Sequence, residues 1–229
     1  MPRRTTAGTA GLVFHVLNRG VRRMQLFDRP QDYHAFLTLF AQAQHRTSLR
    51  CLSYCLMPNH FHFVLWPDRD EQLSEFMFRL SMTHSQRWHA AHGTRGTGPV
   101  YQGRFKALPV STDAHFLRLC KYVEQNPLRA GLVSRAEAWP WSSLAQRLGL
   151  RRAVKLGVWP VATPDLWVEL VNSGSPAEVD EIRMSIRRGA PYGPELWREL
   201  LAPRLNLRRS LAPLGRPRKS KPGVLFPVP

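Results

Sequence analysis

Residues 49–66 limit the possible folds more than any other part of the sequence. Two apolar segments, LRCLSYCLM (49–57) and HFHFVLW (60–66), are separated only by Pro58-Asn59, a pair typical of tight turns. This pattern predicts an antiparallel β-hairpin. Side chains alternate between faces along a strand, so His60 and His62 share one face and the two phenylalanines occupy the other. One face of the hairpin can therefore enter a core, while the other carries two imidazoles that need polar partners.

The segments around the hairpin complete a β-α-β-β-α-β order. LVFHVLNRGV (12–21) and RFKALPVS (104–111) are typical of strands. Apolar residues at helical spacing predict helices over 29–47 and 70–93. A further helix over 112–126 follows the last strand, and Pro127 is expected to end it. This order predicts an α+β fold, a ferredoxin-like antiparallel sheet with helices packed on one face.

A change of composition near residue 145 divides the chain. Residues 1–145 are expected to form the folded core, and residues 146–229 a basic, mainly helical extension with a flexible tail. From Ala202 onward the sequence contains no acidic residue and seven Lys and Arg.

Charge is the strongest bulk feature. The chain has 33 Lys and Arg against 16 Asp and Glu, which gives a formal net charge of +17. Arginine supplies most of the excess, and its guanidinium binds phosphate bidentately. A basic excess on both sides of residue 145 predicts a nucleic-acid partner. An anionic membrane surface and Arg-rich codon usage are the alternatives, and the membrane ranks lower because no basic amphipathic helix with an exposed apolar face stands out.

Cysteine content and hydropathy bear on location. Cys51, Cys55 and Cys120 are an odd number without a disulfide framework, which favours a reducing cytoplasm. No apolar stretch approaches the ~18 residues of a membrane span, and the N-terminal segment lacks the apolar region of a signal peptide. We expect a cytoplasmic protein that is associated with the nucleoid when it binds DNA.

The two histidines of the hairpin are candidate metal ligands. Imidazoles on one strand face can bind a divalent cation together, although two hydrogen-bonded histidines would explain the pattern equally well. A zinc site that includes Cys51 and Cys55 is a further alternative, but the spacing of the four residues is not that of usual zinc sites. On a strand that faces a core, these cysteines are expected to be small buried apolar residues.

The helix that contains KYVEQNPLRAG supplies a candidate nucleophile. Tyr122 and Asn126 are four residues apart, so they lie on one helix face. Asn126 could complete the metal site while Tyr122 faces whatever the metal binds. A phenol becomes a useful nucleophile where positive charge favours the phenolate, and Lys121 and Arg129 flank this turn. A packed tyrosine and a capping asparagine would explain the same spacing.

Several motifs, in a fixed order between residues 15 and 143, resemble a known family: HVLNRG, CLMPNHFHFVLWP, YQGRFKALPV, YVEQNPLRAGLV and WPWSS. They are similar to those of REP-associated tyrosine transposases, relatives of the single-tyrosine HUH transposases of bacterial insertion sequences. The resemblance covers about two-thirds of the chain, and LRRSLAPLGRPRKS resembles the C-terminal end of the same group. It implies a ferredoxin-like HUH nuclease core that cuts single-stranded DNA at a hairpin-forming element.

The resemblance also implies roles for individual residues. His60 and His62 match the metal-binding pair, and Tyr122 matches the nucleophile, which would become joined to a 5′ phosphate in a transesterification. Asn126 stands where the insertion-sequence relatives have a Gln as the third metal ligand. His15 is a rival for that position, although a structural role is the expectation for it. The implied cofactor is Mg²⁺ or Mn²⁺.

Basic residues near these motifs are expected to contact DNA, most strongly Arg19 and Arg104, whose motifs match the family. The predicted DNA-binding set is Arg19, Arg22, Arg104, Lys106, Lys121, Arg129, Arg208, Arg209, Arg216 and Arg218.

These inferences predict a metal-dependent single-stranded DNA endonuclease and strand transferase that cleaves hairpin-forming repeat DNA similar to repetitive extragenic palindromes. A domesticated relative that binds a DNA or RNA hairpin without cutting it is the alternative, and a zinc-stabilised structural module is a third. Insertion-sequence relatives act as dimers that exchange the tyrosine helix, whereas the long extension here would favour a monomer. Both states, monomer and homodimer, stay open.

Overall fold

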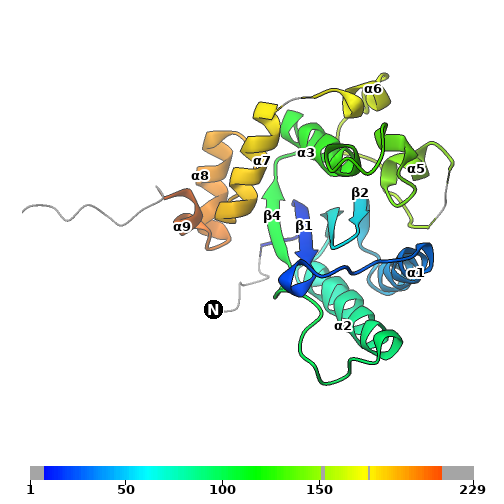
Figure 1. The fold of residues 1–229 in the computed structure, drawn as a ribbon. Coiled ribbons are helices and arrows are strands. Elements are labelled where there is room, and N and C mark those ends of the chain that lie inside the picture. Colours follow the sequence, from blue (N-terminus) through cyan, green and yellow to red (C-terminus); the bar gives the residue numbers. More distant parts are fainter. Residues whose placement is uncertain (1–7, 151–152, 175, 213–229) are drawn as a thin grey trace, which may run out of the picture.

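The computed structural model describes residues 8–150, 153–174 and 176–212. These described residues form four strands and a series of helices, and the helices lie in two layers around one sheet (Figure 1). In chain order the elements are β1 (Val13–Arg19), η1 (Val21–Arg23), α1 (Pro30–Thr47), β2 (Arg50–Met57), β3 (His60–Trp66), α2 (Gln72–His92), β4 (Lys106–Val110), α3 (Ala114–Glu124), α4 (Asn126–Arg129), η2 (Ala136–Ala138), α5 (Ser143–Arg147), α6 (Trp167–Asn172), α7 (Pro176–Arg188), α8 (Glu195–Arg204) and α9 (Arg208–Leu211).

The sheet has the strand order β2-β3-β1-β4, and all neighbouring strands are antiparallel. This is the topology of a ferredoxin-like fold, so the predicted fold class is confirmed. The hairpin of β2 and β3 turns at Pro58-Asn59 as predicted, and Met57 pairs with His60 next to the turn. Helix α2 ends at Gly93, whose φ of 64° is the left-handed conformation that glycine adopts without strain.

Helices α1 and α2 cover one face of the sheet (Figure 1). Phe61 and Phe63 of β3 point to this face and pack against Phe36 and Phe40 of α1, with ring centroids 5.4 Å apart for Phe36–Phe61 and 5.0 Å for Phe40–Phe63. The period of two in HFHFVLW therefore places the phenylalanines in a core and the histidines on the opposite face.

The opposite face is covered by α3, which follows the β-α-β-β-α-β unit, together with α6 and α7 (Figure 1). Buried Leu52, Cys55 and Val64 of the sheet pack there with side chains of these helices. The three cysteines are buried and free of disulfides. These apolar side chains explain why the sheet needs a second helical layer, since a face exposing them would be unstable in water.

Residues beyond 145 pack into the same body. Helix α5 runs across residue 145, and Trp159, Trp167 and Ile182 share a buried cluster with Phe116 and Val123 of α3. The extension also covers both sheet edges: residue 157 donates its backbone N–H to Cys51 of β2, and residues 109 and 111 of the β4 edge exchange backbone hydrogen bonds with Tyr192. The proposed boundary between a core of residues 1–145 and an extension of residues 146–229 therefore remains a prediction.

One helix boundary differs from the sequence prediction. Pro127 was expected to end the helix over 112–126, but α3 ends at Glu124, and Pro127 lies in the first turn of the short helix α4. Proline lacks the N–H that a first helical turn does not use, so it begins a helix as readily as it ends one. Within the described ranges, no helix is long and apolar enough to cross a membrane.

Candidate functional site

The two histidines of β3 lie side by side on the face of the sheet that α3 covers. The ring centroids of His60 and His62 are 5.1 Å apart, and the rings meet edge to face. His62 is buried, with 3% of its surface exposed, whereas His60 is partly exposed. The alternation of side chains along β3 thus places both predicted histidines on one face, with His60 partly exposed to solvent and His62 buried.

A third imidazole joins the pair from β1. His15 lies opposite Val64 in the β1–β3 register, so it is a diagonal neighbour of His62 on the same face. Its Nε2 is 2.8 Å from Nδ1 of His62, and the two rings stack with centroids 5.1 Å apart. His15 is therefore a hydrogen-bond partner of His62.

Helix α3 places Tyr122 against these rings. The Tyr122 ring meets His62 edge to face at a centroid distance of 5.7 Å, and His15 at 6.1 Å. Tyr122 is buried. Three segments that are distant in the sequence, β1, β3 and α3, thus converge on one place and bring the predicted nucleophile to His62 and His15.

Asn126 and Arg129 lie next to Tyr122. Asn126 Nδ2 donates to the carbonyls of Tyr122 (3.1 Å) and Val123 (3.3 Å), while its Oδ1 accepts from Arg129 at 2.7 Å. The Arg129 guanidinium lies over the Tyr122 ring, 4.2 Å from its centroid, a favourable cation–π geometry. Asn126, the first residue of α4, thus caps the C-terminal end of α3 and anchors Arg129, so one lone pair of its Oδ1 is already used.

Burial keeps the three imidazoles neutral. Burial lowers the pKa of His15 to about 3. Burial, with the nearby Arg19 and Arg129, lowers the pKa of His60 to about 4. The pKa of His62 falls well below its ordinary value, through burial first and the neighbouring His15 and His60 next. Neutral imidazole is the form that binds a metal ion.

The histidine pair fits the donor chemistry of a divalent cation. Nδ1 of His60 contacts Asn59 Oδ1 at 2.6 Å, and Nδ1 of His62 contacts His15. Within the part of the chain that the structure describes, Nε2 of both rings is left without a hydrogen bond. No group of three or more His, Cys, Asp or Glu side chains among the described residues is arranged to hold a metal. The pair would need oxygen ligands in addition, such as Asn126 Oδ1, water or a phosphate.

Predicted DNA-binding residues at the sheet lie around this face. Arg19 is directly opposite His60 in the β1–β3 register and is half-buried. Arg22 and Arg104 are exposed in the loops at the same end of β1 and β4. Lys106 is exposed but donates to the carbonyl of Ile186 at 3.2 Å. Arg19 therefore lies nearest the histidines in the sheet.

The remaining predicted basic residues lie farther along the chain. Lys121 faces the extension, where its Nζ is 3.6 Å from Glu178 and 3.3 Å from the Ser173 hydroxyl. Arg208 and Arg209 are exposed on α9. Arg216 and Arg218 lie outside the described residues. Arg129 is the member of the set that the structure brings to Tyr122.

The alternative sites lack the chemistry that the histidine face offers. Burial raises the pKa of the Cys51 and Cys55 thiols, so neither is a thiolate ready for zinc. Tyr101 is buried and hydrogen-bonded to His84 at 2.7 Å, which anchors its loop rather than exposing a ring for base stacking.

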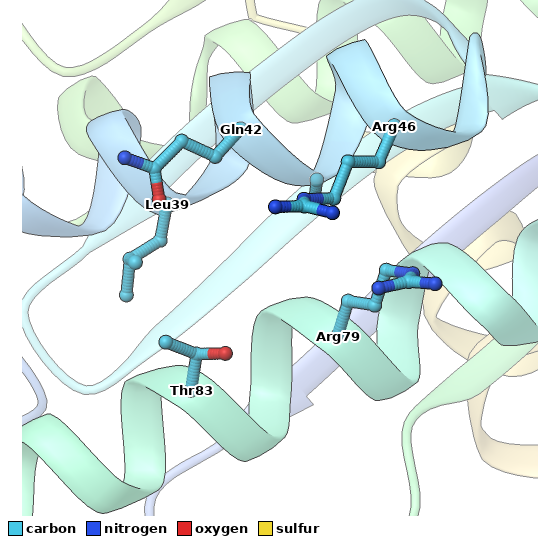
Figure 2. A pocket seen from close by; sticks show the side chains of 6 residues that line it. Leu39, Gln42, Arg46, Arg79 and Thr83 are labelled. Atoms are coloured by element: carbon cyan, nitrogen blue, oxygen red, sulfur yellow. The ribbon is translucent and has the colours of Figure 1, made fainter.

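A small pocket lies between α1 and α2, on the sheet face opposite the histidines. Figure 2 shows side chains of both helices facing one another across it, and the labelled ones are Leu39, Gln42, Arg46, Arg79 and Thr83. Arg79 is engaged by Glu75 at 3.3 Å. The pocket contains no nucleophile or metal-ligand pair, so it offers no alternative to the histidine site.

Sequence reasoning did not assign two partners of the site. Asn59 was interpreted only as a turn residue, and Glu124 was not considered. Glu124 is fully buried and accepts from Ser143 at 2.5 Å and from Trp167 Nε1 at 2.8 Å. The position of Asn59 directly before His60 was the one available signal. The partners of Glu124 lie in distant segments of the chain, and no regular sequence spacing predicts that they meet Glu124.

Comparisons with known proteins found a matching family model and a solved structure with a similar fold. A family model described as "Transposase IS200 like" matches residues 9–126, just over half of the 229 residues. A solved structure of a REP-associated tyrosine transposase bound to a REP hairpin is 19% identical, with 71% of this chain and 94% of that chain covered and a TM-score of 0.52. A putative transposase from Deinococcus radiodurans R1 is 17% identical, with coverage of 54% and 95% and a TM-score of 0.38. No curated protein matches.

Proposed function

Because the chain belongs to the IS200-like transposase family, we propose that it is a metal-dependent endonuclease and strand transferase for single-stranded DNA, with Tyr122 as the nucleophile. The observation that carries the proposal is the edge-to-face placement of Tyr122 against His62, 5.7 Å between centroids, on a helix distant in sequence from the hairpin. The solved structure that shares this fold contains a REP hairpin, and we propose a hairpin-forming repeat as the substrate here.

The reaction that we propose is the transesterification that the resemblance to tyrosine transposases implies. The Tyr122 phenol gives up its proton to water as the oxygen attacks the scissile phosphorus, the bond from phosphorus to the 3′ oxygen breaks, and the departing oxygen takes up a proton from water to leave a 3′ hydroxyl. The DNA 5′ end stays joined to Tyr122 as a phosphodiester. Since one ester is exchanged for another, the reverse attack by a 3′ hydroxyl rejoins DNA without ATP.

The chain's own residues orient these groups. Arg129 over the Tyr122 ring places positive charge where the phenolate forms and beside the incoming phosphate. Arg19, opposite His60, is positioned to bind the neighbouring phosphate. His60 and His62 would hold Mg²⁺ or Mn²⁺, with Asn126 as the proposed third ligand. When bound, the cation supplies a Lewis acid for a phosphate oxygen.

Substitution of the nucleophile tests the proposal. The wild-type protein, incubated with a single-stranded hairpin oligonucleotide and Mn²⁺, should give a covalent protein–DNA band on a denaturing gel. Tyr122→Phe should bind the oligonucleotide with unchanged affinity but lose the band by at least ~10³-fold. Tyr192→Phe is the matched control, because Tyr192 packs against His115 at the β4 edge and should not affect cleavage.

The outcomes separate the two candidate activities. Hairpin binding by the wild type without any covalent band or cut strand would make the protein a non-catalytic hairpin binder. Cleavage by Tyr122→Phe at the wild-type rate would exclude Tyr122 as the nucleophile.

A further inference from the structure

Each histidine of the candidate metal-binding pair contacts one specific neighbour through Nδ1. For His60 the neighbour is Asn59, whose Oδ1 lies 2.6 Å from Nδ1. A carbonyl oxygen only accepts hydrogen bonds, so His60 Nδ1 must carry the hydrogen. Asn59 Nδ2 donates to the carbonyl of Arg23 at 3.3 Å, and this bond fixes which way the amide faces. His60 is thereby left with its lone pair on Nε2.

For His62 the neighbour is His15. Two arrangements satisfy the 2.8 Å contact between His15 Nε2 and His62 Nδ1. If His15 donates, His62 carries its hydrogen on Nε2 and cannot bind a metal through that atom. If His62 donates from Nδ1, its Nε2 has the free lone pair. Both rings are buried, at 1% and 3% exposure, so water does not compete for this bond.

We propose that Asn59 and His15 are positioning residues, which accept from Nδ1 of His60 and His62 and so direct both Nε2 atoms toward one divalent cation. This inference rests on the proposed function and deepens it. The acceptor that fixes the tautomer differs between the two histidines. For His60 it is an adjacent turn residue, and for His62 it is an imidazole on the neighbouring strand. Partners of this kind typically affect metal affinity 10- to 100-fold.

The same geometry separates this role from direct ligation by His15. As a third ligand, His15 would have to give up its hydrogen bond to His62 or bind through Nδ1. As a positioning residue it keeps the bond, and it can be replaced by any side chain that accepts from His62 Nδ1. Glutamine, through Oε1, is such a side chain, whereas phenylalanine fills the space without accepting.

The test measures Mn²⁺ binding to the full-length protein by calorimetry in the absence of DNA. His15→Phe and Asn59→Ala should each weaken Mn²⁺ binding by about 10-fold or more, and His15→Gln should restore it to within about 3-fold of the wild type. His84→Phe is the matched control. This substitution also removes a buried histidine that makes a hydrogen bond, in this case with Tyr101. Because His84 lies on the opposite side of the sheet from His60 and His62, the Mn²⁺ affinity should not change.

A second measurement uses the wild-type protein, so it does not depend on the folding of a variant. Two-bond ¹⁵N–¹H correlation spectra of the metal-free protein should show His60 and His62 as Nδ1–H tautomers and His15 with an unprotonated Nε2. An Nε2–H tautomer at either ligand would overturn the proposal. The proposal would also be overturned if His15→Phe and Asn59→Ala both bound Mn²⁺ with wild-type affinity. If His15→Gln lost Mn²⁺ binding as completely as His60→Ala does, His15 would be a ligand and not a positioning residue.

Failure of the proposed function is distinguishable from failure of this inference. A wild-type protein that forms no covalent DNA adduct, yet binds Mn²⁺ and loses affinity in His15→Phe, would contradict the nuclease while supporting the positioning role. If the wild-type protein forms the adduct but all variants bind Mn²⁺ with equal affinity, the result would support the nuclease and contradict the positioning role.

Discussion

Asp113 caps helix α3, which carries the candidate nucleophile. Its Oδ1 accepts from the backbone N–H of His115 at 2.7 Å, from the Ser111 hydroxyl at 2.8 Å and from the His115 ring at 2.8 Å. Burial raises the pKa of Asp113, but these hydrogen bonds together outweigh burial and leave the pKa below its ordinary value. The carboxylate therefore stabilises the folded state in its charged form.

This cap predicts a pH-dependent effect on stability. Because the folded-state pKa is depressed, the contribution of Asp113 is present above its unfolded pKa of about 4 and is lost as the pH falls through the folded pKa. Asp113→Ala should lower the free energy of unfolding by about 1 kcal/mol near neutral pH, and by less as the pH drops below about 4. Thermal unfolding across this range measures the difference.

Asparagine provides the control at the same position. It caps helices as well as aspartate does but does not titrate. Asp113→Asn should therefore stay close to the wild type near neutral pH. A constant difference between wild type and Asp113→Ala across the acid range would show that the charge of Asp113 does not contribute.

Single residues differed in how well the sequence predicted them. His60 and His62 could be placed because a period of two is a local rule, and the family-like motif singled out Tyr122. The partners of those residues could not be assigned. The His15–His62 contact depends on strand register, and Arg129 reaches Asn126 Oδ1 only because the chain turns again at α4.

Helix α3 is the element that joins the histidine-bearing face of the sheet to the extension. Glu124, two residues after Tyr122, accepts from Trp167 of α6, and the Gln125 side chain donates to the carbonyl of Ser173 at 2.8 Å. Arg118 pairs with Glu178 of α7 at 3.3 Å. The helices after residue 145 thus hold α3, which carries the proposed nucleophile, in place.

Loss of one of these contacts should destabilise the fold. Trp167→Phe keeps an aromatic ring but removes the N–H that satisfies the buried Glu124 carboxylate. We expect the free energy of unfolding to fall by about 2 kcal/mol in urea titrations. Trp88→Phe is the matched control, because Trp88 Nε1 has no hydrogen-bond partner among the described residues. Equal effects of the two substitutions would contradict the anchoring role of Trp167.

Most elements of the core could be predicted because each carries its own periodicity and its own stop signal, such as Gly93 after α2. The face that each C-terminal helix covers could not, because α6 and α7 are fixed by tertiary contacts with α3 rather than by local pattern. Proline at residue 127 misled the prediction because one residue type both ends helices and begins them.

At the scale of the whole molecule, the net charge of +17 predicts strongly salt-dependent DNA binding. The double substitution Arg208→Gln/Arg209→Gln on exposed α9 should lower the slope of log affinity against log salt by about 1.5, as expected for two lost phosphate contacts. Fluorescence anisotropy with a labelled hairpin oligonucleotide over a salt series measures this slope.

A control variant with the same change in net charge shows whether the effect on the slope depends on where the two charges lie. Arg69 and Arg135 are already paired with Glu75 and Glu137, so Arg69→Gln/Arg135→Gln should leave the slope near that of the wild type. If both double variants changed the slope equally, α9 would not contact DNA.

The central claim is that Tyr122 becomes joined to DNA, and peptide mapping of the adduct tests it most directly. The wild-type protein is incubated with a hairpin oligonucleotide and Mn²⁺, digested with protease and nuclease, and analysed by mass spectrometry. We predict one modified peptide, with a nucleotide attached through its 5′ phosphate to Tyr122, and a free 3′ hydroxyl on the released strand. A nucleotide on any other residue, attachment through a 3′ phosphate, or cut DNA without an adduct would contradict the account.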